Sequence, residues 1–409
     1  MDLQKIEIRP FQTASIHETY LLEISGRFFE IGKDTAELLT YFKNNGCEKE
    51  SIEAYVKLCD NYTPEEINDF LESISEKLDD EEINNDKRKT FLYNKELLPT
   101  SVVNRYSSIL KVLFNKWVMF FGILLFVILD ILYFVDFTLS GKHNLTINLY
   151  VLLILLFILI FSSFFHELGH ASACRYWGIS HGGVGLGIYI NMPVFYTDVS
   201  SIWKLSRMKR LVVNLGGVYF QMLFLIPFLV ICLFYRNNIL DFIILTVNFN
   251  FPLTLNPFFK FDGYWIMTDA LGVANLRQRG KEWLRYILKK IRRRPINNYP
   301  YLLSLSKGAK VALITYTLIV NLFFGFYFFY MIPLFFIQFY HTFPNRIMQL
   351  LEELSYRQTP DWTNLQQIIL QLFFCGLFFY MIYRILYPLL KKWIKSDSIT
   401  KQYGGIKQK

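Results

Sequence analysis

The sequence predicts an α-helical polytopic membrane protein with about six transmembrane helices and a small N-terminal α+β domain. Three observations predict this fold class. Hydrophobic residues make up 53% of the 409 residues and aromatic residues 18%, which is more than an ordinary soluble domain carries. From Trp117 onward the chain contains apolar runs that are each near the roughly 20 residues needed to cross a bilayer. The first 85 residues have the mixed polar and apolar pattern of a soluble domain.

The N-terminal domain is expected to span residues 1–85. "KIEIRPF", "TYLLEIS" and "RFFEIG" are typical of short strands, and two segments of helical periodicity follow. A third helix is predicted after Thr63, where Pro64 suits the first helical position and Glu66 completes a capping box. Strands followed by about three helices favour a winged-helix-like domain. We expect residues 86–110 to be a linker, because the polar stretch "DDEEINNDKRK", residues 79–89, runs into them.

The apolar runs divide the rest of the chain into a core of four spans, residues 111–295, and a C-terminal part, residues 296–409, with two spans and a basic tail. Pro252 and Pro257 interrupt the fourth span. The six predicted spans are 117–138, 147–174, 208–235, 239–271, 311–340 and 364–390.

Basic residues cluster on one side of these alternating spans. They precede the first span, separate the second from the third, form the run "RQRGKEWLRYILKKIRRR" after the fourth, and follow the sixth. The positive-inside rule makes that side cytoplasmic, together with both termini. We therefore interpret the net charge of +9 as a determinant of membrane topology. We expect membrane lipid as a partner and expect no nucleic-acid binding. On the other side, "NRIMQLLEELSYR" either lies flat in the membrane interface or is an ordinary loop helix.

The second span ends in "FFHELGHASAC", which places three polar side chains at a membrane boundary. His166 and His170 are four residues apart and lie on one helical face, so both can bind one metal ion. Glu167 is adjacent and can act as the base for a metal-activated water. This pattern predicts a zinc site with one catalytic ion.

A catalytic zinc needs a third protein ligand. Asp262, in "LNPFFKFDGYW" of the fourth span, is expected at the same membrane depth as His170 and is our candidate. His181, in the loop after the second span, and Cys174 are the alternatives. Asp130, in the middle of the first span, either pairs within the helix bundle or has a function.

"HELGH" near the end of one span and "NPFFKFDG" in a later one resemble the site-2 protease family of intramembrane zinc metallopeptidases, over about residues 115–295. The resemblance implies that His166, His170 and Asp262 bind zinc and that Glu167 is the general base. The family often has a small-Gly-Pro-x-x-Asn pattern between these motifs, where this chain has "GGVYFQ". Gln221 is thus a candidate for oxyanion binding or for helix packing, and Asn256 a candidate for substrate contact.

The segments "MPVFYTDVS", "DGYW" and "ANLRQR" look like the peptide zinc metallopeptidase branch of that family, found beside peptide-modification and export systems. This implies a bacterial inner-membrane protein with a peptide substrate and, as partners, a peptide-modifying enzyme or an ABC exporter. "GIYINMPVFYT" is expected to form a hairpin or re-entrant loop that either pairs with an extended peptide or only connects two spans.

The N-terminal domain is similar to the leader-peptide recognition elements of ribosomally made, modified peptide pathways. The resemblance implies a peptide site along the third strand, Arg27, Phe28, Phe29, Glu30 and Ile31. A generic small regulatory domain is the alternative.

The expected function is an intramembrane zinc endopeptidase that matures such a peptide near the cytoplasmic face. One alternative is regulated cleavage of a signalling protein. The other is a non-enzymatic peptide-binding or immunity component of the membrane.

Overall fold

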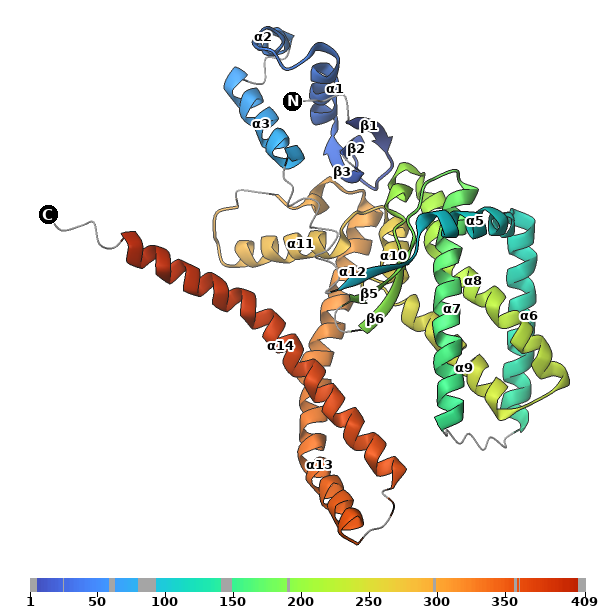
Figure 1. Cartoon of the computed structure of the whole chain (residues 1–409). Coiled ribbons are helices and arrows are strands. Elements are labelled where there is room, and N and C mark those ends of the chain that lie inside the picture. The colour runs from blue at the N-terminus through green and yellow to red at the C-terminus, as the bar shows by residue number, and fades with distance from the viewer. Residues whose placement is uncertain are drawn as a thin grey trace. The chain divides into compact units, whose positions relative to one another are not determined.

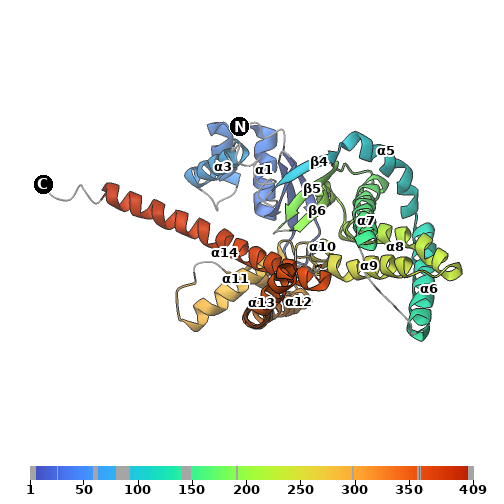
Figure 2. The same ribbon diagram turned by 60° about the horizontal axis from the view of Figure 1, so that its bottom comes forward.

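The computed structural model describes residues 6–24, 26–58, 63–79, 93–140, 149–189, 192–296, 299–356, 359 and 361–403 (Figures 1 and 2). The chain divides into two compact units, Met1–Thr317 and Leu318–Lys409. The candidate site residues all lie in the first unit.

The N-terminal domain combines a three-stranded antiparallel sheet with three helices. The strands are β1 (Glu7–Phe11), β2 (Thr19–Ile24) and β3 (Arg27–Gly32), in that spatial order. The helices are α1 (Lys33–Asn45), α2 (Lys49–Leu58) and α3 (Pro64–Asp79). The predicted capping box forms, since Thr63 N donates to Glu66 Oε2 at 3.0 Å and Glu66 N donates to Thr63 Oγ1 at 3.3 Å. The helices pack their apolar stripes on one face of the sheet.

The segment expected as a linker, residues 86–110, is partly regular structure. Residues 93–110 form β4 (Asn94–Leu98) and α5 (Thr100–Leu110). β4 pairs with β5 (Val184–Tyr189), which pairs in turn with β6 (Met192–Thr197), giving an antiparallel sheet in the order β4-β5-β6. The β5–β6 pair is the hairpin expected from "GIYINMPVFYT". Figure 2 shows the three strands beside one end of α7 (Leu149–Tyr176).

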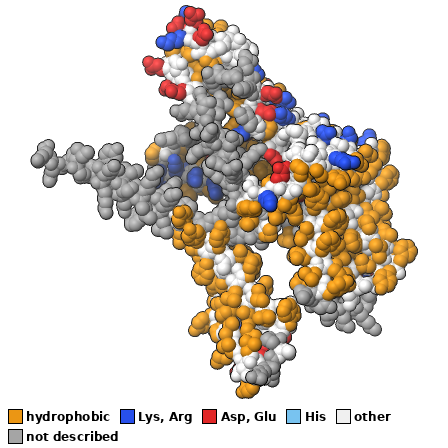
Figure 3. Space-filling model, viewed as in Figure 1, with side chains coloured by type: hydrophobic (Ala, Val, Ile, Leu, Met, Phe, Trp, Pro, Cys, Tyr) orange, Lys and Arg blue, Asp and Glu red, His pale blue; other side chains and the backbone are white. Residues whose placement is uncertain are grey.

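Five helices of the described chain are long and apolar enough to cross a membrane. They are Lys116–Leu139, Tyr150–Tyr176, Arg207–Phe234, Lys307–Ser355 and Trp362–Tyr380. The protein is therefore a plausible polytopic membrane protein, as predicted. Figure 3 shows apolar side chains over the outside of the bundle formed by α6 (Lys116–Ser140), α7, α8 (Arg207–Phe234) and α9 (Asn238–Thr254). Phe234 is 87% exposed, which suits hydrocarbon and not water.

The predicted fourth span, 239–271, is not a single helix. It consists of the 17-residue α9, an irregular segment 255–261, and α10 (Asp262–Leu271). Pro252 and Pro257 have no backbone N–H to continue the helix. Asn256 Oδ1 instead accepts the N–H of Phe258 at 2.8 Å, closing a turn.

α10 leads into the basic helix α11 (Leu276–Ile291). Short 3₁₀ turns complete the first unit at Lys111–Phe114, Ser200–Lys204 and Tyr301–Ser304. α12 (Lys307–Phe326) then crosses from the first unit into the second.

The second unit is built from long helices. α12 continues through a π-helical stretch, Tyr327–Met331, into α13 (Ile332–Ser355), and α14 spans Trp362–Tyr403. "NRIMQLLEELSYR" was expected as a separate interfacial or loop helix, but its first eleven residues continue α13. Pro344 lies inside that helix without ending it. Gln371 Nε2 donates to Thr342 Oγ1 at 2.9 Å, which joins α14 to α13.

Candidate metal centre

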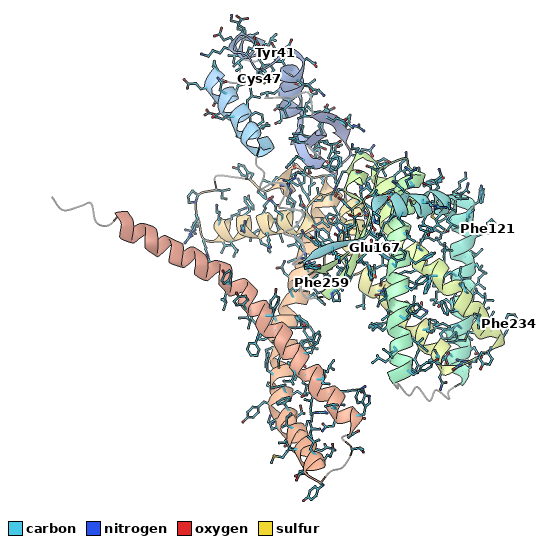
Figure 4. All side chains as sticks on the ribbon, in the orientation of Figure 1. Tyr41, Cys47, Phe121, Glu167, Phe234 and Phe259 are labelled. Carbon is cyan, nitrogen blue, oxygen red and sulfur yellow. The ribbon has the colours of Figure 1, made fainter. Side chains whose placement is uncertain are left out.

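The end of α7 carries His166, Glu167 and His170, and all three are buried, with exposed fractions of 8%, 8% and 7%. The helix continues to Tyr176, so the three residues lie within regular helix. The spacing of four residues brings the two imidazoles onto one face, with ring centroids 4.8 Å apart. Figure 4 shows Glu167 near this end of α7, on the side of the β4–β6 sheet.

Asp262 and the two histidines form a group of three side chains that could hold a metal ion. Asp262 Oδ2 lies 2.9 Å from His166 Nε2 and 3.2 Å from His170 Nε2, and the two Nε2 atoms are 3.1 Å apart. Ligands of a tetrahedral zinc ion with bonds of about 2.0–2.1 Å are about 3.3 Å apart. The three donor atoms therefore converge at nearly the spacing that such an ion requires, and the donor set of two imidazoles and one carboxylate fits it.

A backbone contact orients the second imidazole. His170 Nδ1 lies 2.8 Å from the carbonyl oxygen of Val213 on α8, so Nδ1 carries the proton and Nε2 presents its lone pair to the cluster. The Nδ1 atom of His166 is buried and has no hydrogen-bond partner among the described residues. The ring of His166 is instead fixed by packing against α8.

Glycines bring α7 and α8 close enough for that packing. A Cβ at Gly169 would lie 2.2 Å from the carbonyl oxygen of Gly216, and a Cβ at Gly217 would lie 2.3 Å from His166 Nε2. The two glycines of "GGVYFQ" therefore let α8 approach α7 closely, with Gly216 against Gly169 and Gly217 against His166. Figure 1 shows α8 crossing α7 obliquely.

Several contacts hold the segment before Asp262. The guanidinium of Arg277 on α11 donates to the carbonyl of Phe258, and Tyr316 Oη on α12 donates to the carbonyl of Pro257 at 3.1 Å. A Cβ at Gly263 would lie 2.0 Å from the carbonyl oxygen of Leu255, so α10 can fold back on this segment only with glycine there. The irregular stretch is thus fixed, and Asp262 at the first position of α10 points to the histidines.

The other predicted contact residues, Gln221 and Asn256, each have a partner within the protein. Gln221 is 1% exposed, and its Nε2 lies 3.5 Å from Ser162 Oγ on α7, one turn before His166. That position is typical of an amide in helix packing. The Asn256 side-chain oxygen closes the turn with Phe258 and so has a structural task in this conformation.

The alternative ligands lie outside the cluster. His181 Nε2 is 3.1 Å from Ser107 Oγ and its Nδ1 is 2.8 Å from the carbonyl of Gly182. Burial lowers the pKa of His181, which favours the neutral ring. Cys174 is fully buried in the apolar cluster between α5, α7 and α8. Asp130 Oδ1 accepts from Asn248 Nδ2 at 2.9 Å within the helix bundle.

One face of the N-terminal sheet contacts the rest of the first unit. In the β2–β3 register Glu23 lies opposite Phe28 and Leu21 opposite Glu30, so these four side chains share that face. Lys204 forms an ion pair with Glu23 at 2.8 Å and lies 5.9 Å from the centre of the Phe28 ring.

The predicted peptide site is therefore only partly open. Glu30 Oε1 accepts from Tyr301 Oη at 2.6 Å, so both Phe28 and Glu30 are engaged. Arg27, Phe29 and Ile31 alternate to the face that α1–α3 cover, where Ile31 packs against the domain core and Phe29 remains 43% exposed.

Sequence reasoning missed a second acid on α10, Asp269, which is buried. Asp269 Oδ1 accepts from Arg210 Nε at 2.6 Å, and its Oδ2 accepts from Asn214 Nδ2 at 2.8 Å. A charged side chain inside a predicted span was the available signal. The missed β4 strand lay in a segment dominated by polar and linker-like residues.

No protein-family model, no curated protein and no solved structure matches this chain.

Proposed function

We propose that this protein is a membrane-embedded zinc endopeptidase that cleaves a peptide precursor near the cytoplasmic face of a bacterial inner membrane. The observation that carries the proposal is the convergence of His166 Nε2, His170 Nε2 and Asp262 Oδ2 at 2.9–3.2 Å, with Glu167 next in the chain. Three lone-pair donors aimed at one point are stabilised by a cation between them, and a structural ion would not need an adjacent buried base.

His166, His170 and Asp262 would hold the ion, and Val213 would keep His170 in the tautomer whose Nε2 is free to bind. Zinc, when bound, supplies the Lewis acid that polarises the scissile carbonyl and makes water acidic. Glu167 takes the proton from the attacking water and then gives it to the leaving amine. Three protein ligands leave a coordination position for water or substrate.

The edge of the β4–β6 sheet suggests how the substrate is presented. Thr197 Oγ1 on β6 lies 3.5 Å from the carbonyl oxygen of Glu167, so this strand runs beside the end of α7. β6 pairs with β5 on one side, and its other side is an edge of the described sheet. An extended peptide paired with that edge would present its backbone beside the cluster.

The proposal is tested with Glu167→Gln, which keeps the size of the side chain and removes the base. We expect the purified variant to retain zinc and to lose cleavage by about 10²- to 10⁴-fold. The measurements are metal content and mass spectrometry of small peptides from cells that express each form. Glu50→Gln on the exposed side of α2 is the matched control.

The same comparison separates the alternatives. Loss of a clipped membrane protein, with no change in the peptides, would favour regulated cleavage of a signalling protein. An unchanged product pattern in Glu167→Gln cells would contradict any protease role and leave the non-enzymatic alternative.

A further inference from the structure

A buried ionic junction lies at the far end of the helix that carries the third ligand. Asp269 follows Asp262 by seven residues, or about two turns, so both acids lie on the same side of α10. Asp269 pairs with Arg210 and accepts from Asn214, both on the first turns of α8. Arg210 is 2% exposed and Asp269 3%, so the pair is shielded from water.

The same stretch of α8 supports the two histidines. Its Val213 carbonyl accepts from His170 Nδ1, and its Gly217 lies against the ring of His166. Arg210 to Gly217 therefore sets the spacing between α7, which bears the histidines, and α10, which bears Asp262. A shift of α10 along α8 would move Asp262 relative to both imidazoles.

The N-terminal domain covers this junction. The guanidinium of Arg210 lies 5.1 Å from the centre of the Phe11 ring and 5.2 Å from that of Trp203, and the two ring centroids are 5.9 Å apart. Phe11 is the last residue of β1 and is 8% exposed. Because a buried ion pair is strong only while water is excluded, this ring cover stabilises the link between Arg210 and Asp269.

The connection between β1 and β2 also holds the end of α10 directly. Ala14 N donates to the carbonyl of Gly272 at 2.8 Å, and Gly272 ends α10 in the left-handed conformation with φ 66°. The carbonyl of Ala14 accepts from Ser306 N at 3.0 Å. The domain thus holds the C-terminal end of α10 directly through the backbone of Ala14, and indirectly through Phe11 and the Arg210–Asp269 pair.

We propose that the N-terminal domain is a positioning element of the metal centre. Through Phe11 and Ala14 it fixes the C-terminal end of α10, and this fixes the carboxylate of Asp262 at the other end. The domain is therefore required for a tight metal site even when no substrate is present. The inference rests on the proposed function only in taking Asp262 as a metal ligand.

The test uses the full-length protein in detergent with two independent measurements. Hydrogen exchange of residues 262–272 in the metal-free protein reports how firmly α10 is held. The rate at which a chelator removes zinc reports the metal site. We expect Phe11→Ala to accelerate both, with zinc loss on the order of tenfold faster, because the ion pair loses its aromatic cover. Phe11→Leu, which keeps an apolar side chain over the ion pair, should accelerate hydrogen exchange and zinc loss less than Phe11→Ala does.

Two further variants separate the junction from general damage to the domain. Leu58→Ala truncates an exposed side chain at the end of α2 in the same domain and should behave as the unmodified protein in both measurements. Trp203→Leu removes the second ring from outside the domain and should reproduce Phe11→Ala.

If hydrogen exchange and the rate of zinc loss in both Phe11→Ala and Trp203→Leu equalled those of the unmodified protein, the inference would be overturned and the protease proposal would stay intact. If the unmodified protein held no zinc while exchange still responded to Phe11→Ala, the metal centre would be overturned and the link between the domain and α10 would stand.

Discussion

At the scale of single residues, the distance between α7 and α8 depends on glycines that have no side chain to separate the helices. Gly217 lies against His166, and the missing Cβ would be 2.3 Å from the Nε2 atom that faces His170 and Asp262. Gly169 makes a similar approach to the backbone of Gly216. The metal-binding geometry therefore depends on residues that bind nothing themselves.

Gly217→Ala should displace the imidazole of His166 and weaken zinc binding by at least about tenfold, because one ligand leaves its position. The α8 helix itself should persist, since alanine is the better helix former. Chelator competition on the purified protein measures the first effect and circular dichroism the second.

Gly325→Ala is the control for this substitution. Gly325 is also helical, but a Cβ there would meet nothing within 4 Å. Equal zinc affinity in Gly217→Ala and the unmodified protein would show that the ring of His166 is not held by this contact.

Residue spacing predicted the three candidate ligands, because HExxH fixes its geometry within one helix and the later motif carries its own Asp-Gly. The structure brings these three residues together. Residue spacing could not predict the pair of Asp269 and Arg210, or the contact of Gly217 with His166. Those contacts join helices whose residues are about fifty positions apart in the sequence. Periodicity identifies which face of a helix is apolar and does not name the residue on the opposite helix.

At the scale of secondary-structure elements, two acids within predicted spans have different surroundings. Asp130 lies in the middle of α6 and pairs with Asn248 of α9. Asp262 begins α10 after an irregular segment and faces two imidazoles. The first arrangement joins two helices, and the second brings together three side chains that could hold a metal ion.

Asp262→Ala should therefore lose zinc and activity, whereas Asp130→Ala should retain zinc. Elemental analysis of the two purified variants decides the matter, and each serves as the control for the other. A fully loaded Asp262→Ala protein would show that another side chain is the third ligand.

Element types followed from the sequence where the pattern was long or its ends were marked. Four of the five long helices and the capped α3 are examples. The exception is Lys307–Ser355, which joins the predicted fifth span to the segment expected as a separate helix. β4 was missed because five residues of a strand hold too little pattern, and its pairing with β5 is contributed by a segment about ninety residues away. The break in the fourth span was expected from its two prolines, and α9 ends at Thr254. Of the two, Pro252 lies inside α9 and Pro257 in the irregular segment after it.

At the scale of the whole molecule, the long helices and the basic segments predict one orientation. Lysines and arginines lie on α11 and in the connection before α8. Figure 3 shows basic side chains gathered at one end of the apolar bundle. The positive-inside rule would place that end, and with it the metal centre, on the cytoplasmic side.

Cysteine labelling tests this orientation in a protein whose native cysteines have been replaced. Lys281→Cys, exposed on α11, should react with an impermeant maleimide only after the cells are opened. Tyr235→Cys, at the opposite end of α8 and 65% exposed, should react in intact cells. The reverse pattern would invert the topology and place the metal centre on the outer side.

The N-terminal sheet is covered on one face by its own helices and contacts the remainder of the first unit with the other. This arrangement constrains how the amino-acid sequence can change between related proteins. Several outward-facing side chains must suit a partner encoded about two hundred positions later, as Phe11 must suit Trp203 and Glu23 must suit Lys204. Related sequences should therefore vary at such positions in pairs. A lineage that lost the domain would be expected to vary at Trp203, which would lose Phe11 as a partner, and to keep Arg210, which would still pair with Asp269.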